Sequence, residues 1–168
     1  MVINGESAKV QRRRQKTAPL PTLFIGEYLA AVTEGKRVAI PKRFREQFGS
    51  NDLVITRGYE GCMVIVAQAQ FARLLEGITD VPFISADKRE TSRFLLSGAH
   101  EIEPDAQGRI ILPESLVQYA AVSGGDVVFI GVGNWVEVWD KSAWQEYQKR
   151  LTQESVTIAD RLLGNVQA

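Results

Sequence analysis

The sequence predicts an α+β protein, mainly β with short helices, built from two similar halves in tandem. The segment from Asp105 to Pro113 contains a turn, a short apolar strand and a proline that can begin a helix. A related segment runs from Thr33 to Pro41, 72 positions earlier. Chance similarity is the competing interpretation, but the arginine, proline and apolar positions agree in order. We therefore expect each half to contain a hairpin, a short helix, a second hairpin and a longer helix.

The first unit is expected to span residues 23–80 and to begin with two short strands on either side of Gly26. Residues 38–40 are predicted to return against them, after a tight turn in which Gly35 supplies a positive backbone angle. Pro41 suits the first turn of a helix, because the N–H that it lacks has no partner there. The remaining expected elements are a helix (42–48), a hairpin (53–56 with 62–66) and a second helix (68–76).

A linking helix at residues 81–97 is expected to join the first unit to the second, which spans residues 98–151. Ser85 is a residue type that caps the start of such a helix. The second unit repeats the scheme of the first. Its expected elements are a short helix (114–120), a hairpin (126–130 with 135–139) and a closing helix (141–151).

Both ends of the chain depart from this pattern. Residues 1–22 lack periodicity and carry five basic residues against one acidic residue, which predicts a disordered basic arm. Such an arm either contacts nucleic-acid phosphates or has no specific role, and the sequence leaves both open. Residues 152–168 form a weakly amphipathic tail, which is either a helix that packs on a neighbour or a frayed end.

The net formal charge is zero, but the charged residues are unevenly distributed. Residues 1–99 carry 15 Lys and Arg against 10 Asp and Glu, and residues 100–168 carry 5 against 10. Either the first half presents a basic working surface, or the opposite charges promote head-to-tail association of subunits.

The sequence contains no clear signal for secretion, membrane insertion or catalysis. The single cysteine, Cys62, excludes an internal disulfide and is expected to be a buried thiol. No apolar run approaches the roughly 20 residues of a membrane helix, and no signal segment follows the amino-terminal charges, so we expect a cytoplasmic protein. One histidine, His100, cannot build a histidine metal site. We expect no enzyme activity, no cofactor, no metal and no small-molecule substrate.

The two repeated turns each end in an arginine, Arg37 and Arg109, ahead of an apolar strand. The planar guanidinium group suits both phosphate oxygens and the edge of guanine, so these arginines predict a DNA interface. More basic residues follow the first turn. A solvated helix face is the plainer interpretation of such a run, but its position beside a repeated turn favours binding. The predicted DNA-binding residues are Lys36, Arg37, Lys42, Arg43, Arg45 and Arg109.

The residues expected to shape the turns are Gly35, Asp105 and Gly108. The Asp105 carboxylate is expected to accept hydrogen bonds from the turn backbone and to fix Arg109. Thr33 stands at the position of Asp105 and can do this only weakly, so the first turn is expected to be the more mobile. We therefore predict that Arg109 contacts bases; the reverse assignment, with Arg37 in that role, stays open.

These turns, together with the segments 94–99 and 128–133, resemble the MraZ family of bacterial transcription regulators, which is grouped with AbrB-like swapped-hairpin proteins. The family pattern is an aspartate, three residues, an arginine and an aliphatic–proline step, and the second copy satisfies it. In the first copy Thr33 replaces the aspartate and Lys36 replaces the expected glycine. The resemblance covers about residues 23–151.

The resemblance implies two swapped-hairpin units that form a compact double-psi-type barrel. It also implies a nucleoid-associated, ring-like homo-oligomer that binds double-stranded DNA at short direct repeats in the promoter of the division and cell-wall gene cluster. Few contacts per subunit bind weakly, whereas several linked copies gain by effective concentration. The alternatives are an AbrB-type antitoxin-like module that binds DNA and a partner, an enzyme on a related barrel, and a purely structural assembly protein.

Overall fold

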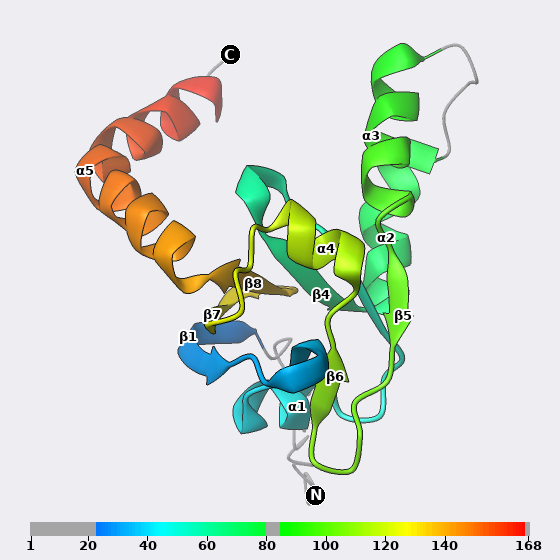
Figure 1. Cartoon of the computed structure of the whole chain (residues 1–168). Helices are drawn as coiled ribbons and strands as arrows, with labels where there is room; N and C mark the ends of the chain where they lie inside the picture. Colours follow the sequence, from blue (N-terminus) through cyan, green and yellow to red (C-terminus); the bar gives the residue numbers. More distant parts are fainter. Residues whose placement is uncertain (1–22, 80–84, 167–168) are drawn as a thin grey trace, which may run out of the picture.

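The computed structural model of the protein describes residues 23–79 and 85–166, so the predicted basic arm at 1–22 lies outside the described residues. The strands are β1 (Phe24–Ala31), β2 (Arg37–Ala39), β3 (Leu53–Arg57), β4 (Met63–Ala67), β5 (His100–Ile102), β6 (Arg109–Ile111), β7 (Asp126–Gly133) and β8 (Val136–Asp140). The helices are α1 (Lys42–Phe48), α2 (Gln68–Thr79), α3 (Ala86–Leu96), α4 (Glu114–Tyr119) and α5 (Lys141–Val166), with short 3-10 turns at Glu34–Lys36 and Tyr59–Gly61. In Figure 1, α2 and α3 lie side by side and α5 leads away from the opposite side of the sheet.

Strands from both halves combine in one six-stranded antiparallel sheet with the order β1-β7-β8-β4-β3-β5. β1 of the first half pairs with β7 of the second half, from Phe24 opposite Gly133 to Ala31 opposite Asp126. In the same way, β5 of the second half pairs with β3 of the first. Each half therefore gives its first strand to the other half, and the two repeats form one structural body.

The predicted return of residues 38–40 against the first strand is wrong. β2 pairs instead with β6 of the second half, with Val38 opposite Ile110, in a separate two-stranded ribbon. Both side chains are buried in the common core. A tight turn permits a local hairpin but does not select the partner strand; here the shared burial of two apolar side chains selects it.

The described strand pairs form an open six-stranded sheet and a two-stranded ribbon rather than a closed ring of strands. The α+β class and the tandem repeat are therefore present, while the double-psi barrel implied by the resemblance is not confirmed. One core lies between the sheet, the ribbon and the short helices, and it contains residues of both halves.

Helix α1 begins after Pro41 and places Phe44 and Phe48 on one face. The ring of Phe24 in β1 meets Phe44 edge-on, with ring centroids 5.7 Å apart, and lies 4.4 Å from the ring of Phe48. Burying one such side chain contributes about 1.5–3 kcal/mol to stability. This packing fixes α1 against the core and so determines which of its side chains face outward.

Helix α5 is longer than predicted: the closing helix expected at residues 141–151 continues to Val166. Its first turns pack on the sheet through Trp144, in a second and smaller apolar cluster. Beyond residue 151 the described side chains are exposed, among them Leu162 and Leu163. The segment has no glycine or proline before its last turn, so helix propensity continues without tertiary contacts. None of the helices within residues 23–79 and 85–166 is long and apolar enough to cross a membrane.

Candidate nucleic-acid interface

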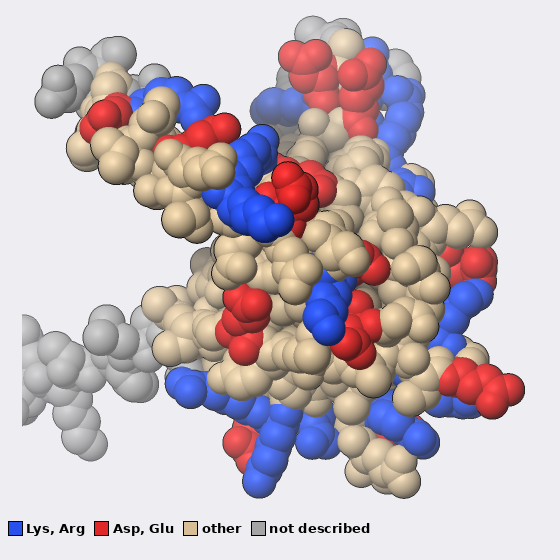
Figure 2. Space-filling view, turned by 60° about the vertical axis from the view of Figure 1, so that its left-hand side comes forward, with Lys and Arg blue, Asp and Glu red and all other residues tan. Residues whose placement is uncertain are grey.

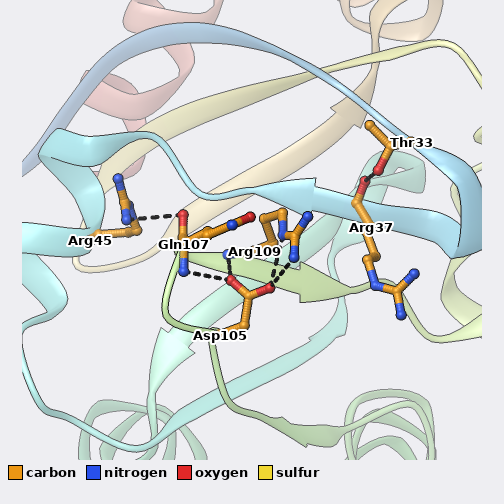
Figure 3. A network of polar contacts seen from close by, with 6 residues as sticks. All are labelled: Thr33, Arg37, Arg45, Asp105, Gln107 and Arg109. Carbon is orange, nitrogen blue, oxygen red and sulfur yellow. Dashed lines mark hydrogen bonds and ion pairs between the residues drawn. The ribbon is translucent and has the colours of Figure 1, made fainter.

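The second turn is held by the carboxylate of Asp105 (Figure 3). Its Oδ1 accepts hydrogen bonds from the backbone N–H groups of Gln107 and Arg109, both at 2.9 Å. Its Oδ2 accepts a hydrogen bond from Nε of Arg109 at 2.8 Å and forms an ion pair with Nη2 at 2.8 Å. These donors, above all the backbone N–H of Arg109, hold the pKa of the Asp105 carboxyl below its ordinary value. One side chain thus fixes both the turn and its arginine.

The backbone of the second turn supports the same geometry. The N–H of Gly108 donates to the carbonyl of Asp105 at 2.8 Å, and the N–H of Asp105 donates to the carbonyl of Arg109 at 2.9 Å. Gly108 has a φ of 75°, in the left-handed region that glycine adopts without steric cost. Gly108 is also buried, because the side chain of Arg45 lies against it.

The first turn lacks the carboxylate. Thr33 stands at the position of Asp105, and its hydroxyl donates one hydrogen bond, to the carbonyl of Arg37, at 3.1 Å. Two successive residues, Gly35 and Lys36, have positive φ angles of 73° and 57°. Lys36 occupies the place of Gly108, so a residue with a Cβ adopts the left-handed region, at a cost of about 1–2 kcal/mol. Fewer interactions therefore hold the first turn than the second.

Arg37 and Arg109 lie on the outer face of the β2–β6 ribbon. Arg37 is opposite Ile111 and Arg109 is opposite Ala39, and side chains at these positions share the face turned away from the core. Both arginines line a shallow depression of about 370 Å³. The Arg37 guanidinium makes no hydrogen bond or ion pair with any residue that the structure describes, and Figure 3 shows it apart from the Asp105 network. It is therefore available to an external anion.

Helix α1 adds cations beside the ribbon, through the exposed side chains of Lys42 and Arg43. The ammonium of Lys42 lies 3.7 Å from the carboxylate of Glu46, an exposed pair of the kind that contributes little to stability. Figure 2 shows Lys and Arg side chains gathered at the end of the molecule where Figure 1 places α1 and the ribbon. The counterpart helix α4 has Glu114 and Ser115 at the positions of Lys42 and Arg43, so the basic helix belongs to the first half.

Besides Arg109 and Lys42, whose pairs with Asp105 and Glu46 lie within their own half, two more of the six predicted DNA-binding side chains have partners, in both cases in the other half. The ammonium of Lys36 forms an ion pair with the carboxylate of Glu114 at the start of α4. The Nη1 of Arg45, which is half-buried, donates a hydrogen bond to the carbonyl of Gln107 at 3.3 Å. Sequence analysis did not identify Glu114 or Gln107 as part of the site. The 72-residue offset, which aligns Glu114 with Lys42, is the signal that could have identified α4 as a neighbour of the site.

Within the described residues, no group of three His, Cys, Asp or Glu is placed to hold a metal ion. Burial raises the pKa of the Cys62 thiol, so the thiol stays protonated and is a poor nucleophile. The ring of His100 has its Nε2 3.5 Å from the hydroxyl of Ser115. The guanidinium and ammonium groups at the basic end are chemically suited to binding anions.

These features define a class of protein: an α+β tandem repeat whose halves exchange strands and whose paired turns carry arginines at a basic end. A family model described as "MraZ protein, putative antitoxin-like" matches residues 23–94 and, a second time, residues 95–166. A protein named Transcriptional regulator MraZ from Natranaerobius thermophilus is 40% identical over 141 residues, which cover 84% of this chain and 97% of that protein. A protein of the same name from Bifidobacterium longum is 38% identical over 150 residues, 89% of this chain and 99% of that protein. The chain belongs to the MraZ family, and these relatives are named as transcriptional regulators, not as enzymes.

Proposed function

We propose that the chain is a DNA-binding transcription regulator that contacts double-stranded DNA with the end formed by the β2–β6 ribbon and α1. The observation that carries this proposal is the placement of Arg37 and Arg109 on one outer face of the ribbon, with the exposed Lys42 and Arg43 beside them. Cations in such a cluster neutralise phosphates and supply most of the affinity. The names of the relatives support the same function.

The four exposed or half-exposed cations have different tasks in this proposal. Arg109 is fixed by Asp105 at a defined angle, which suits a guanidinium that contacts the edge of a base. Arg37, Lys42 and Arg43 have no such support and suit phosphate contacts, which position the protein without selecting sequence. Lys36 and Arg45 adjoin this surface, but their charged groups are bound to residues of the other half, Glu114 and Gln107.

The proposed targets are short direct repeats in the promoter of the division and cell-wall gene cluster, bound by a ring-like homo-oligomer in the cytoplasm at the nucleoid. The resemblance to the MraZ family supports these finer points. Physical reasoning agrees, because one chain presents a small basic surface and several linked chains bind repeated sites with a much higher effective concentration.

A second candidate is an antitoxin-like module that binds both DNA and a protein partner. The observation in its favour is the exposure of apolar side chains on the free half of α5, with Val156 at 72%, Leu162 at 67% and Leu163 at 64%. Replacing both leucines by serine separates the candidates. Loss of self-association by light scattering would indicate that α5 serves the oligomer, whereas an unchanged oligomer that no longer retains a protein partner would favour the second candidate.

The test of DNA binding is a gel-shift titration with the region upstream of the protein's own gene and with a scrambled duplex of equal length. We expect binding that weakens steeply between roughly 50 and 200 mM salt, since phosphate contacts release counterions. The double variant Arg37→Ala/Arg43→Ala should bind both duplexes more weakly. Lys149→Ala, which removes an exposed cation from α5 at a distance from the basic end, is the matched control. Salt-independent binding, or equal losses in the variant and the control, would contradict the proposed interface.

A further inference from the structure

Arg45 is half-buried, although it stands in the basic run of α1. Its side chain crosses from the first half of the molecule to the turn of the second half, where Nη1 donates to the carbonyl of Gln107 (Figure 3). A Cβ added to Gly108 would lie 2.1 Å from Nη1 and 2.3 Å from Cδ of Arg45. The guanidinium and its stem therefore fill the space above a residue that has no side chain.

The interior end of the guanidinium is also withdrawn from solvent. The Nε of Arg45 is buried and has no hydrogen-bond partner among the residues that the structure describes. A phosphate contact requires the donors of an arginine to face outward, as those of Arg37 do. The geometry of Arg45 is instead that of a side chain used to hold a loop.

The first turn has no equivalent support. The counterpart of Arg45, 72 positions later in α4, is Val117, which cannot donate a hydrogen bond. The counterpart of Gly108 is Lys36, whose own side chain extends to Glu114. Gly35 in the first turn is exposed, and a Cβ there would meet nothing nearer than the mobile end of Arg37 at 3.0 Å.

We propose that Arg45 is a positioning residue for Arg109 and not a DNA contact, an inference that rests on the proposed function. Arg45 holds the carbonyl of Gln107, and the N–H of the same residue donates to Asp105. Asp105 in turn holds the guanidinium of Arg109. The basic helix of the first half thus fixes the base-contacting arginine of the second half through the backbone of one residue, Gln107, and one carboxylate.

The test compares Arg45→Met with Lys42→Met, which removes an exposed cation from the same helix. Each variant is titrated with cognate and scrambled duplexes over a salt series. Lys42→Met should weaken the binding of both duplexes by the same factor. It should also reduce the slope of log K against log salt by about one. Arg45→Met should leave the slope and the binding of scrambled DNA unchanged, and lower the specificity ratio about fivefold, as expected for loss of one hydrogen bond. A slope reduced by about one with an unchanged ratio, or no change in either quantity, would overturn the proposal.

A second measurement uses the protein without DNA and is independent of the proposed function. The Nε–H of Arg109 should give a slowly exchanging NMR signal, because it donates to Asp105. Arg45→Met should accelerate this exchange, and Lys42→Met should leave it unchanged. If Arg45→Met does not fold, Arg45→Lys replaces it, since it keeps the charge and loses the planar donor group. An unchanged exchange rate in a folded Arg45 variant would refute the inference, whereas absence of DNA binding by the parent protein would refute only the proposed function.

Discussion

The two arginine turns share a backbone plan and differ in what holds them. In the second turn, the Asp105 carboxylate binds two backbone N–H groups and the side chain of Arg109. In the first turn, Thr33 supplies a single side-chain hydrogen bond, and the Arg37 guanidinium has no partner among the described residues. The difference between an aspartate in the second turn and a threonine in the first thus decides whether the guanidinium of the turn is fixed or free. A repeated motif can therefore supply a specific contact and a non-specific contact within one molecule.

The helices that follow the two turns differ in charge, and the helix after the less fixed turn is the more basic one. α1 carries Lys42 and Arg43 on its exposed face, whereas α4 has Glu114 and Ser115 at the same places. Along the chain, the less fixed turn thus precedes the helix with the greater positive charge, and the more fixed turn precedes a helix that begins with a carboxylate. In space the contacts cross, because Arg45 of α1 reaches the second turn and Glu114 of α4 pairs with Lys36 of the first. This division agrees with affinity from phosphate contacts in the first half and selectivity in the second.

The largest expected effect comes from removing each arginine in turn. Arg109→Ala should reduce discrimination between cognate and scrambled DNA by about 1–3 kcal/mol, because it removes a base contact. Arg37→Ala should weaken the binding of both duplexes equally and leave the ratio of their affinities unchanged. Competition titrations at fixed salt measure both quantities. If instead Arg37→Ala lowers the ratio of the affinities for cognate and scrambled DNA and Arg109→Ala leaves it unchanged, Arg37 is the base contact and the assignment of the two turns is reversed.

A smaller effect is expected from adding a methyl group to each glycine. Gly108→Ala and Gly35→Ala both place a Cβ at a positive φ, which costs about 1–2 kcal/mol. Gly108→Ala must in addition displace Arg45, whereas Gly35→Ala has room beside the end of Arg37. Thermal unfolding should therefore show the lower Tm for Gly108→Ala. Equal Tm values would mean that the contact between Arg45 and Gly108 contributes nothing to stability.

The smallest expected effect is a change with pH in how firmly Asp105 holds Arg109 in the second turn. The pKa of Asp105 is lowered in the folded protein, so its stabilising contribution is complete above the unfolded pKa of about 4 and is lost as pH falls through the folded value. The exchange rate of the Arg109 Nε–H should rise in that acidic range, and the Arg37 signal should show no matching transition. Asp105→Asn should remove the transition. A transition that persists in this variant would assign it to another group.

Much of the fold follows from local patterns in the sequence. The order of most strands and helices is recognisable from apolar runs and turn residues, and the 72-residue offset shows that the scheme is repeated. The two short strands expected on either side of Gly26 are wrong, because β1 runs through this glycine as one strand. The start of α1 follows from Pro41, and its buried face follows from two phenylalanines one turn apart. The end of α5 could not be predicted, because its free half has no glycine or proline before Gly164 in the last turn and no packing pattern that marks a boundary.

The sequence by itself determined which residues form the turns and that Asp105 and Thr33 stand at equivalent positions, because these depend on neighbours within a few residues. The tertiary structure alone decided that β2 pairs with β6, that Lys36 meets Glu114 and that Arg45 reaches the turn of the other half. Those contacts join residues up to 78 positions apart, and the register of strands selected by burial in the common core sets them. A basic run reads the same whether its side chains face water or another loop, so the difference between Lys42 and Arg45 arises when the two halves exchange strands and bring α1 against the second turn.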